Sequence, residues 1–161
     1  MRPVQWLFVV SAALFVFGVG FVVVGARTAR QVRPVEGPPI VAVASVKQIM
    51  NGIVAPGAKT VFSAVSTTVS AKGIEEKAPQ NDAEWAVVGN SAAAIAEAGN
   101  VLMMNGRAVD RGNWIKMSQA MIEAARQTLK AVDAKSTDGI LDAGAVLNTS
   151  CDNCHQRYQR Q

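Results

Sequence analysis

The chain has 161 residues, half of which are apolar, and it carries a formal net charge of +4. This length suits a single domain with room for one further segment, and the apolar fraction is ample for a core. The lysines and arginines are scattered and are not interleaved with aromatic residues, which argues against nucleic-acid binding. The two cysteines and the single histidine are too few for a structural zinc site, which needs four such ligands.

Residues 1–27 are predicted to form a transmembrane anchor. From Val4 to Ala26 the chain is almost wholly apolar, and about 23 residues in a helix cross a hydrocarbon core of roughly 30 Å. The apolar stretch of a cleaved signal peptide is shorter, at about 7 to 15 residues, and is followed by a small-residue cleavage site. An uncleaved single-span anchor is therefore favoured over a removed signal. The proline-rich residues 28–42 are predicted to form a semi-rigid linker after the anchor.

The remaining residues, 43–161, are predicted to form an all-α domain. Apolar residues recur at helical spacing in four segments, over about residues 43–69, 82–104, 111–134 and 137–160. No segment has a convincing strand pattern, and residues 70–80 are predicted to be a polar connection. The short loops between the last three helices predict an up-down-up-down four-helix bundle.

Capping residues and proline predict where these helices begin and where one of them is interrupted. Asn81 or Asp82 is the expected N-cap of the second helix, and Ser136 is the expected N-cap of the fourth. Asp110 is the corresponding residue for the third helix. Pro56 falls inside the first helix and is expected to kink or restart it. The glycines and alanines of the second helix would let a neighbouring helix or a flat cofactor approach closely.

The C-terminal segment contains both cysteines and the only histidine of the chain, in the order Cys151-Asp152-Asn153-Cys154-His155. C-x-x-C-H is the attachment signature of c-type haem, in which two thiols bond to the haem and the histidine binds the iron. Residues three apart share a face of a helix, so both sulfurs reach one edge of the macrocycle. A redox pair would be expected beside a βαβ pattern, which is missing from this sequence. A simple disulfide is the other alternative, and it would leave the adjacent histidine unexplained.

The end of the chain, from Cys151 to Tyr158, resembles the C-x-x-C-H-x-x-Y ending of the class II cytochromes c, the cytochrome c prime group. The resemblance covers roughly residues 42 to 160; outside the C-terminal motif it consists of general helical patterning. It implies one covalently attached haem c and a domain on the extracytoplasmic side of a membrane. Arg27, Arg30 and Arg33 follow the apolar span and by the positive-inside rule would favour the opposite orientation. The haem motif is expected to override that rule.

An alternating bundle brings the end of its last helix level with the start of the first, the end of the second and the start of the third. Met50, Met103 and Met104 are at this end, and so is Met117, whereas Met121 lies one turn deeper. In low-spin members of the resembled family a methionine early in the first helix is the sixth iron ligand, and Met50 matches that position. Met103 and then Met104 are the next choices. The alternative for each methionine is ordinary core packing.

Haem propionates need cations or water as partners. Lys47 near the start of the first helix, and Arg107 and Arg111 in the loop after the second, are predicted at the haem end. For each of these residues the alternative is a solvated surface position. Tyr158 is expected to cover the solvent side of His155, and Trp114 is expected to be a packing residue.

These features predict a membrane-anchored monohaem c-type cytochrome that carries single electrons to or from a membrane redox complex or other cytochromes. The expected location is the inner, cytoplasmic membrane, with a single span and the haem domain on the periplasmic side. No catalysis is expected, because the only histidine is used by the iron and no acid–base pair remains. Two alternatives stay open: a five-coordinate haem protein that binds NO or CO, and a subunit in which the haem mainly holds the fold together.

Overall fold

The computed structural model describes residues 3–31 and 39–159. The chain divides into two units, Met1–Ile40 and Val41–Gln161, which are considered separately. The predicted linker at residues 28–42 falls only partly within the described residues: residues 28–31 continue the first helix, and residues 32–38 lie outside.

The first unit contains one long helix, α1, from Pro3 to Gln31. Its segment Val4–Gly25 has 22 residues and a mean hydropathy of 2.8, and none of it is buried. A helix of this length and composition is able to cross a membrane. The prediction of one apolar N-terminal helix is therefore confirmed.

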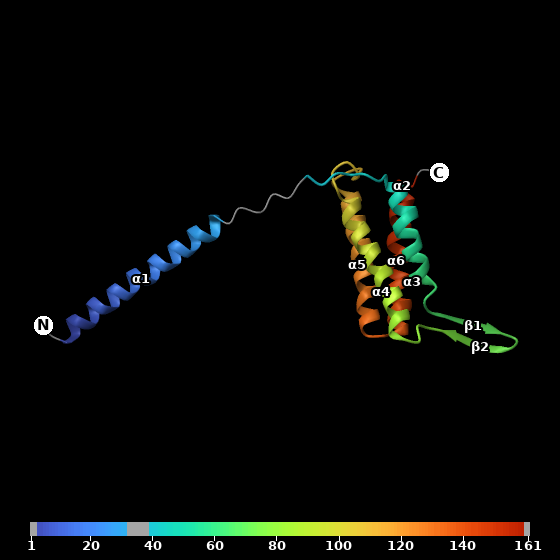
Figure 1. The fold of residues 1–161 in the computed structure, drawn as a ribbon, viewed down its shortest axis with the longest axis horizontal. Helices are drawn as coiled ribbons and strands as arrows, with labels where there is room; N and C mark the ends of the chain where they lie inside the picture. Colours follow the sequence, from blue (N-terminus) through green and yellow to red (C-terminus); the bar gives the residue numbers. More distant parts are fainter. Residues whose placement is uncertain (1–2, 32–38, 160–161) are drawn as a thin grey trace. The chain divides into compact units, whose positions relative to one another are not determined.

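The second unit is mostly helical, as predicted, and its elements are drawn in Figure 1. The first helical stretch consists of a short α-helix, a π-helical turn and a second α-helix: α2 (Val46–Ile49), η1 (Met50–Val54) and α3 (Ala55–Phe62). Three longer helices follow, α4 (Asp82–Leu102), α5 (Asn113–Asp133) and α6 (Thr137–Tyr158). The expected interruption at Pro56 is present as the π-helical turn that precedes it.

The segment between α3 and α4 contains a β-hairpin, so the prediction of no strands is wrong. Strand β1 (Ser66–Ser70) pairs antiparallel with β2 (Gly73–Lys77), and the first helix ends at Phe62, seven residues earlier than the predicted 69. β1 contains a run of β-branched residues, which favour extended backbone. Gly73 has a φ of +126°, a conformation that side chains disfavour and glycine permits. Every residue of both strands is exposed. The strands therefore lack the alternation of apolar and polar residues by which a half-buried strand is predicted.

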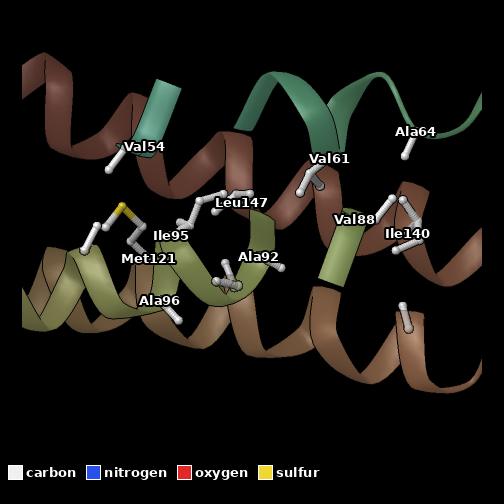
Figure 2. Packing of buried hydrophobic residues seen from close by; sticks show 14 of the residues in the cluster. Val54, Val61, Ala64, Val88, Ala92, Ile95, Ala96, Met121, Ile140 and Leu147 are labelled. Carbon is white, nitrogen blue, oxygen red and sulfur yellow. The ribbon is translucent and has the colours of Figure 1, made fainter. Parts of the chain in front are cut away.

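The core lies between α3, α4, α5 and α6. Helix α4 packs against α5, α5 packs against α6, and α3 contacts both α4 and α6. Val61 of α3, Ile95 of α4 and Leu147 of α6 are completely or almost completely buried, and Figure 2 shows their side chains directed into the space between the helices. Figure 1 shows α2 and the end of α6 at one end of this helical unit, with the hairpin at the opposite end.

The helix boundaries are fixed largely by the predicted capping residues. The Asn81 side chain accepts the Glu84 N–H at 3.0 Å, and Ser136 accepts the Gly139 N–H at 3.0 Å. For α5 the N-cap is Gly112 instead of Asp110. Asp110 nevertheless serves that helix start, because its carboxylate accepts the N–H groups of Gly112 and Trp114 at 2.8 and 3.1 Å.

The close approach of α4 and α5 depends on Gly99. A methyl group added there would overlap the Ile122 side chain and lie 3.2 Å from the carbonyl oxygen of Ser118. Glycine at this position therefore allows the two helix backbones to pack without a side chain between them. This contact agrees with the expectation that small residues of the second helix admit a close neighbour.

Gly99→Ala is expected to destabilise the protein by about 1 kcal/mol, because an overpacking cost of roughly 1–3 kcal/mol exceeds the gain of about 1 kcal/mol in helix propensity. The free energy of unfolding by urea, followed by circular dichroism, measures the change. Gly144→Ala in α6 is the matched control. Its added methyl group meets only Phe62 at 3.8 Å, so it should stabilise the protein by about 0.5–1 kcal/mol. A stabilising Gly99→Ala would contradict the tight contact.

Candidate functional site

A cavity of about 1120 Å³ lies in the second unit, beside the last turns of α6. Its walls come from four parts of the chain: the α2–η1–α3 stretch, the end of α4, the first half of α5 and the C-terminal half of α6. Cys151, Cys154 and His155 all line it. The three chemically distinctive residues of the sequence therefore line one cavity.

The two thiols are held three residues apart on α6, so they share one face of the helix. Both cysteines are free and half-buried. Burial raises the pKa of the Cys151 thiol, with a further contribution from the Asp152 carboxylate, and burial together with Cys151 raises the pKa of Cys154. Reactive and redox-active cysteines have a lowered pKa. The environment of these thiols therefore favours their protonated form.

Met50 lies in η1, half-buried, where it packs against the buried core and lines the cavity with His155. Met103 and Met104 are not among the lining residues. The Met104 sulfur instead accepts a hydrogen bond from the Arg107 guanidinium at 3.1 Å. Of the three methionines that the sequence proposes as ligands, only Met50 shares the cavity with the histidine.

Two further methionines line the cavity from α5, Met117 and Met121. Met121 is 6% exposed and belongs to the buried core, and Figure 2 shows its side chain among those of this core. The sequence analysis places Met117 at this end of the helices and Met121 one turn deeper. Their spacing of one helical turn is the signal that both share a face.

The predicted cationic residues divide into one that lines the cavity and two that do not. Lys47 lines it, as does Lys59, which the sequence analysis did not identify. Arg107 donates from Nε to the carbonyl oxygen of Ala44 at 2.9 Å and so ties the loop after α4 to the segment before α2. Arg111 is exposed and is not a lining residue. Lys59 lies three turns beyond Lys47 on the same helical stretch, which is the pattern that could have revealed it.

A small network fastens the end of α6 to the start of α5. The Tyr158 hydroxyl donates a short hydrogen bond to the Asp110 carboxylate, and the Tyr158 ring meets Trp114 edge-on at 5.0 Å between centroids. The Trp114 indole N–H donates to the carbonyl oxygen of Leu102 at 2.8 Å. Tyr158 therefore packs inward against α5, and its contacts hold the turn that carries His155.

Among residues 3–31 and 39–159, no group of three or more His, Cys, Asp or Glu side chains is placed to hold a metal ion. A haem iron does not require such a group, because the porphyrin supplies most of its ligands and the protein only the axial ones. Comparison of the chain with protein-family models, with curated proteins and with solved structures found no match. The chemistry of the site is therefore inferred from the residues of the cavity.

Tyr158→Phe is expected to lower the thermal midpoint at neutral pH, since it removes the hydrogen bond to Asp110. That bond, together with the backbone N–H groups of Trp114 and Gly112, lowers the pKa of Asp110 below 3.8. Burial and the same hydrogen bond raise the pKa of Tyr158 above 10.0. The stability from Asp110 is therefore lost as the pH falls through its lowered pKa, and that from Tyr158 is lost as the pH rises through its raised pKa.

The difference in midpoint between the wild type and Tyr158→Phe should be constant from about pH 5 to 9 and should shrink on both sides of this range. Thermal unfolding followed by circular dichroism across the pH range measures it. Asp110→Asn serves as the second variant. In this background, the effect of Tyr158→Phe on the midpoint should no longer depend on pH on the acid side. A difference that does not change at either extreme would contradict the role of this hydrogen bond.

Proposed function

We propose that this chain is a membrane-anchored monohaem c-type cytochrome that carries single electrons to or from a membrane redox complex. The observation that supports this most directly is the convergence of Cys151, Cys154, His155 and Met50 on one cavity of about 1120 Å³. Haem, when bound, supplies an iron that changes between the ferric and ferrous states by one electron. No enzymatic reaction is proposed.

The residues around the cavity fit a covalently attached haem. Cys151 and Cys154 present their thiols on one helix face, and each would form a thioether with a haem vinyl group. His155 follows directly and would provide an imidazole for the iron. Apolar side chains suited to the flat faces of a porphyrin come from α3, α4 and α5, including Ala58, Leu102 and Met121.

Met50 would be the second axial ligand. It lines the cavity from the helical stretch that faces α6 across this space, and a methionine thioether opposite histidine raises the reduction potential of the iron. Lys47 lies one turn before Met50 on the same wall and is the proposed partner of a propionate. Arg107 and Arg111 rank behind Lys47 as propionate partners, because neither lines the cavity. In addition, Arg107 already donates to the Ala44 carbonyl oxygen.

The fold and the anchor fit the same function. The packing of α4 with α5, of α5 with α6 and of α3 with α4 and α6 supports an up-down-up-down bundle. The apolar helix α1 would hold the haem domain at the outer face of the inner membrane. Tethering raises the effective concentration of a carrier near a membrane-bound partner.

A second candidate function, binding of NO or CO by a five-coordinate haem, is favoured by the apolar residues beyond Met50 on the same wall. Val54, Ala58 and Phe62 line the cavity and offer no ligand to an iron. If one of them faced the iron in place of Met50, the sixth position would be open to a small gas.

The absorption spectra of the ferric and ferrous holoprotein distinguish these two functions. A low-spin spectrum with the long-wavelength sulfur-to-iron band, lost in Met50→Ala, is expected for ligation by His155 and Met50. Met103→Ala is the matched control and should keep the band, because Met103 does not line the cavity. A high-spin wild type that takes up CO readily would contradict the electron-carrier function and support gas binding.

The full chain is expected in the membrane fraction and should remain there after an alkaline carbonate wash, because the apolar segment of 22 residues within α1 would be held by burial of its side chains in lipid. Protease added to the outer face of intact spheroplasts should digest the domain that follows residue 41. Release by carbonate, or a mature N-terminus beyond residue 25, would contradict the uncleaved anchor. Protection of the domain from external protease would contradict the proposed orientation.

A further inference from the structure

The β-hairpin stands apart from the packed core of the second unit. Figure 1 shows it projecting from the end of the helices opposite α2, with every strand residue exposed. Its base is fastened to the end of α3, because the Lys77 ammonium group donates to the Ser63 carbonyl oxygen at 2.6 Å. No strand residue lines the cavity beside α6. The hairpin therefore has no part in the site described above.

The two strands lack the support that a small sheet needs. A two-stranded hairpin is marginally stable in water unless a further strand or a helix covers it. Within residues 3–31 and 39–159 the sheet has two strands only, and none of their side chains is buried. Val69 and Ile74 face each other across the strands and keep 77% and 68% of their surface exposed. A third strand would stabilise both the hairpin and this apolar pair.

The two open edges of the hairpin differ in charge. β1 has the sequence Ser-Thr-Thr-Val-Ser, which contains no charged residue and no proline. β2 carries Glu75, Glu76 and Lys77. Charged side chains and proline are means by which edge strands avoid pairing with another chain. The edge of β2 is therefore protected against such pairing, whereas the edge of β1 is not.

β1 is also complementary to itself. When it pairs antiparallel with β1 of a second copy, all five residues are engaged only if Thr68 lies opposite its own equivalent. The other pairs are then serine with serine and threonine with valine, so no charge is brought into the contact. A threonine pair across two strands is one that stabilises a sheet. The corresponding pairing of β2 would place Glu75 opposite its own equivalent, and like charges in that position are destabilising.

The same register gathers the exposed apolar side chains on one face. Residues directly opposite each other in a sheet point to the same side, so Val69 shares a face with Ile74 and with Thr67 of the second copy. The two copies of Val69 become diagonal neighbours, at about 7–8 Å. Both apolar pairs therefore lie on one side of the joined sheet, where each partly covers the other.

We propose that the outer edge of β1 binds β1 of a second copy of this chain, which joins the two hairpins into one four-stranded antiparallel sheet. The contact is isologous, because the same five residues serve both copies, and it therefore closes on a dimer. The proposal goes beyond the electron-carrier function and does not depend on haem, since no strand residue lines the cavity.

Thr68→Cys tests the central pair in the full chain, in membranes. Residues directly opposite in an antiparallel pair have Cβ atoms about 4.5–5.5 Å apart, close to the spacing in a disulfide, so mild oxidation should give a covalent dimer. The wild type controls for Cys151 and Cys154. Ser70→Cys is the matched control and should not cross-link, because its two copies would lie about 14 Å apart along the strands.

Co-expression of two different variants tests the register. A copy with Ser66→Cys should cross-link to a copy with Ser70→Cys, since these two positions face each other in the proposed pair. Equal cross-linking of Thr68→Cys and Ser70→Cys would indicate random collision and would overturn the proposal. Absence of a Thr68→Cys dimer would overturn it too, as would a Thr68→Cys cross-link formed only with a different protein.

Charge substitution distinguishes this contact from association through α1. Thr68→Lys and Thr68→Glu each place like charges opposite each other and should weaken the dimer roughly fivefold, as measured by sedimentation of the full chain in detergent. A mixture of the two variants should recover the dimer, because opposite charges then meet, and this recovery shows that both variants are folded. A dimer that neither substitution weakens would overturn the proposal.

Discussion

The attachment of the last turns of α6 to the rest of the helical unit is the constraint on which the site depends. Cys151, Cys154 and His155 lie within two turns of one another on that helix, so a shift of its end would move all three together. Leu147, which is completely buried, anchors the helix one turn before the first cysteine. Beyond the histidine, Tyr158 holds the final turn through Asp110 and Trp114. The residues of the motif therefore lie between two anchored positions of α6, Leu147 and Tyr158.

The second unit combines a tightly packed core with a large cavity beside the last turns of α6. Toward the middle of the helices, Val61, Ile95 and Leu147 leave almost no exposed surface, as expected for an interior packed at the density of a crystal. Beside α6 the walls separate around a cavity of about 1120 Å³, which is slightly larger than the roughly 300–1,000 Å³ of common small-ligand sites. Apolar and polar side chains both line this cavity, and its size would accommodate the haem that we propose for it.

The sequence correctly predicted those features that depend on neighbouring residues, such as the starts of two helices. The side chains of Asn81 and Ser136 accept backbone N–H groups three residues ahead, so the residue type alone is enough to locate these helix starts. The hairpin at residues 66–77 was missed because its strands are exposed on every side chain and therefore show no alternation of apolar and polar residues. Arg107 was placed at the haem end by its sequence position, but its guanidinium binds the Ala44 carbonyl oxygen, a contact across 63 residues that no local pattern records.

By itself the sequence determined the apolar helix at the N-terminus, the helical character of the second unit and the C-x-x-C-H motif on which the proposed function rests. These depend on composition, on periodicity and on a motif of five consecutive residues, all of which are local properties of the chain. The tertiary structure alone decided which methionine and which lysine share a cavity with His155, since the sequence ranks Met50, Met103 and Met104 by position but does not show which side chain faces the histidine. It also decided the π-helical turn at Met50–Val54, which lies between two tertiary contacts, that of Gly57 with α4 and that of Ala44 with Arg107. Such contacts join residues far apart in the chain, and only folding brings them together.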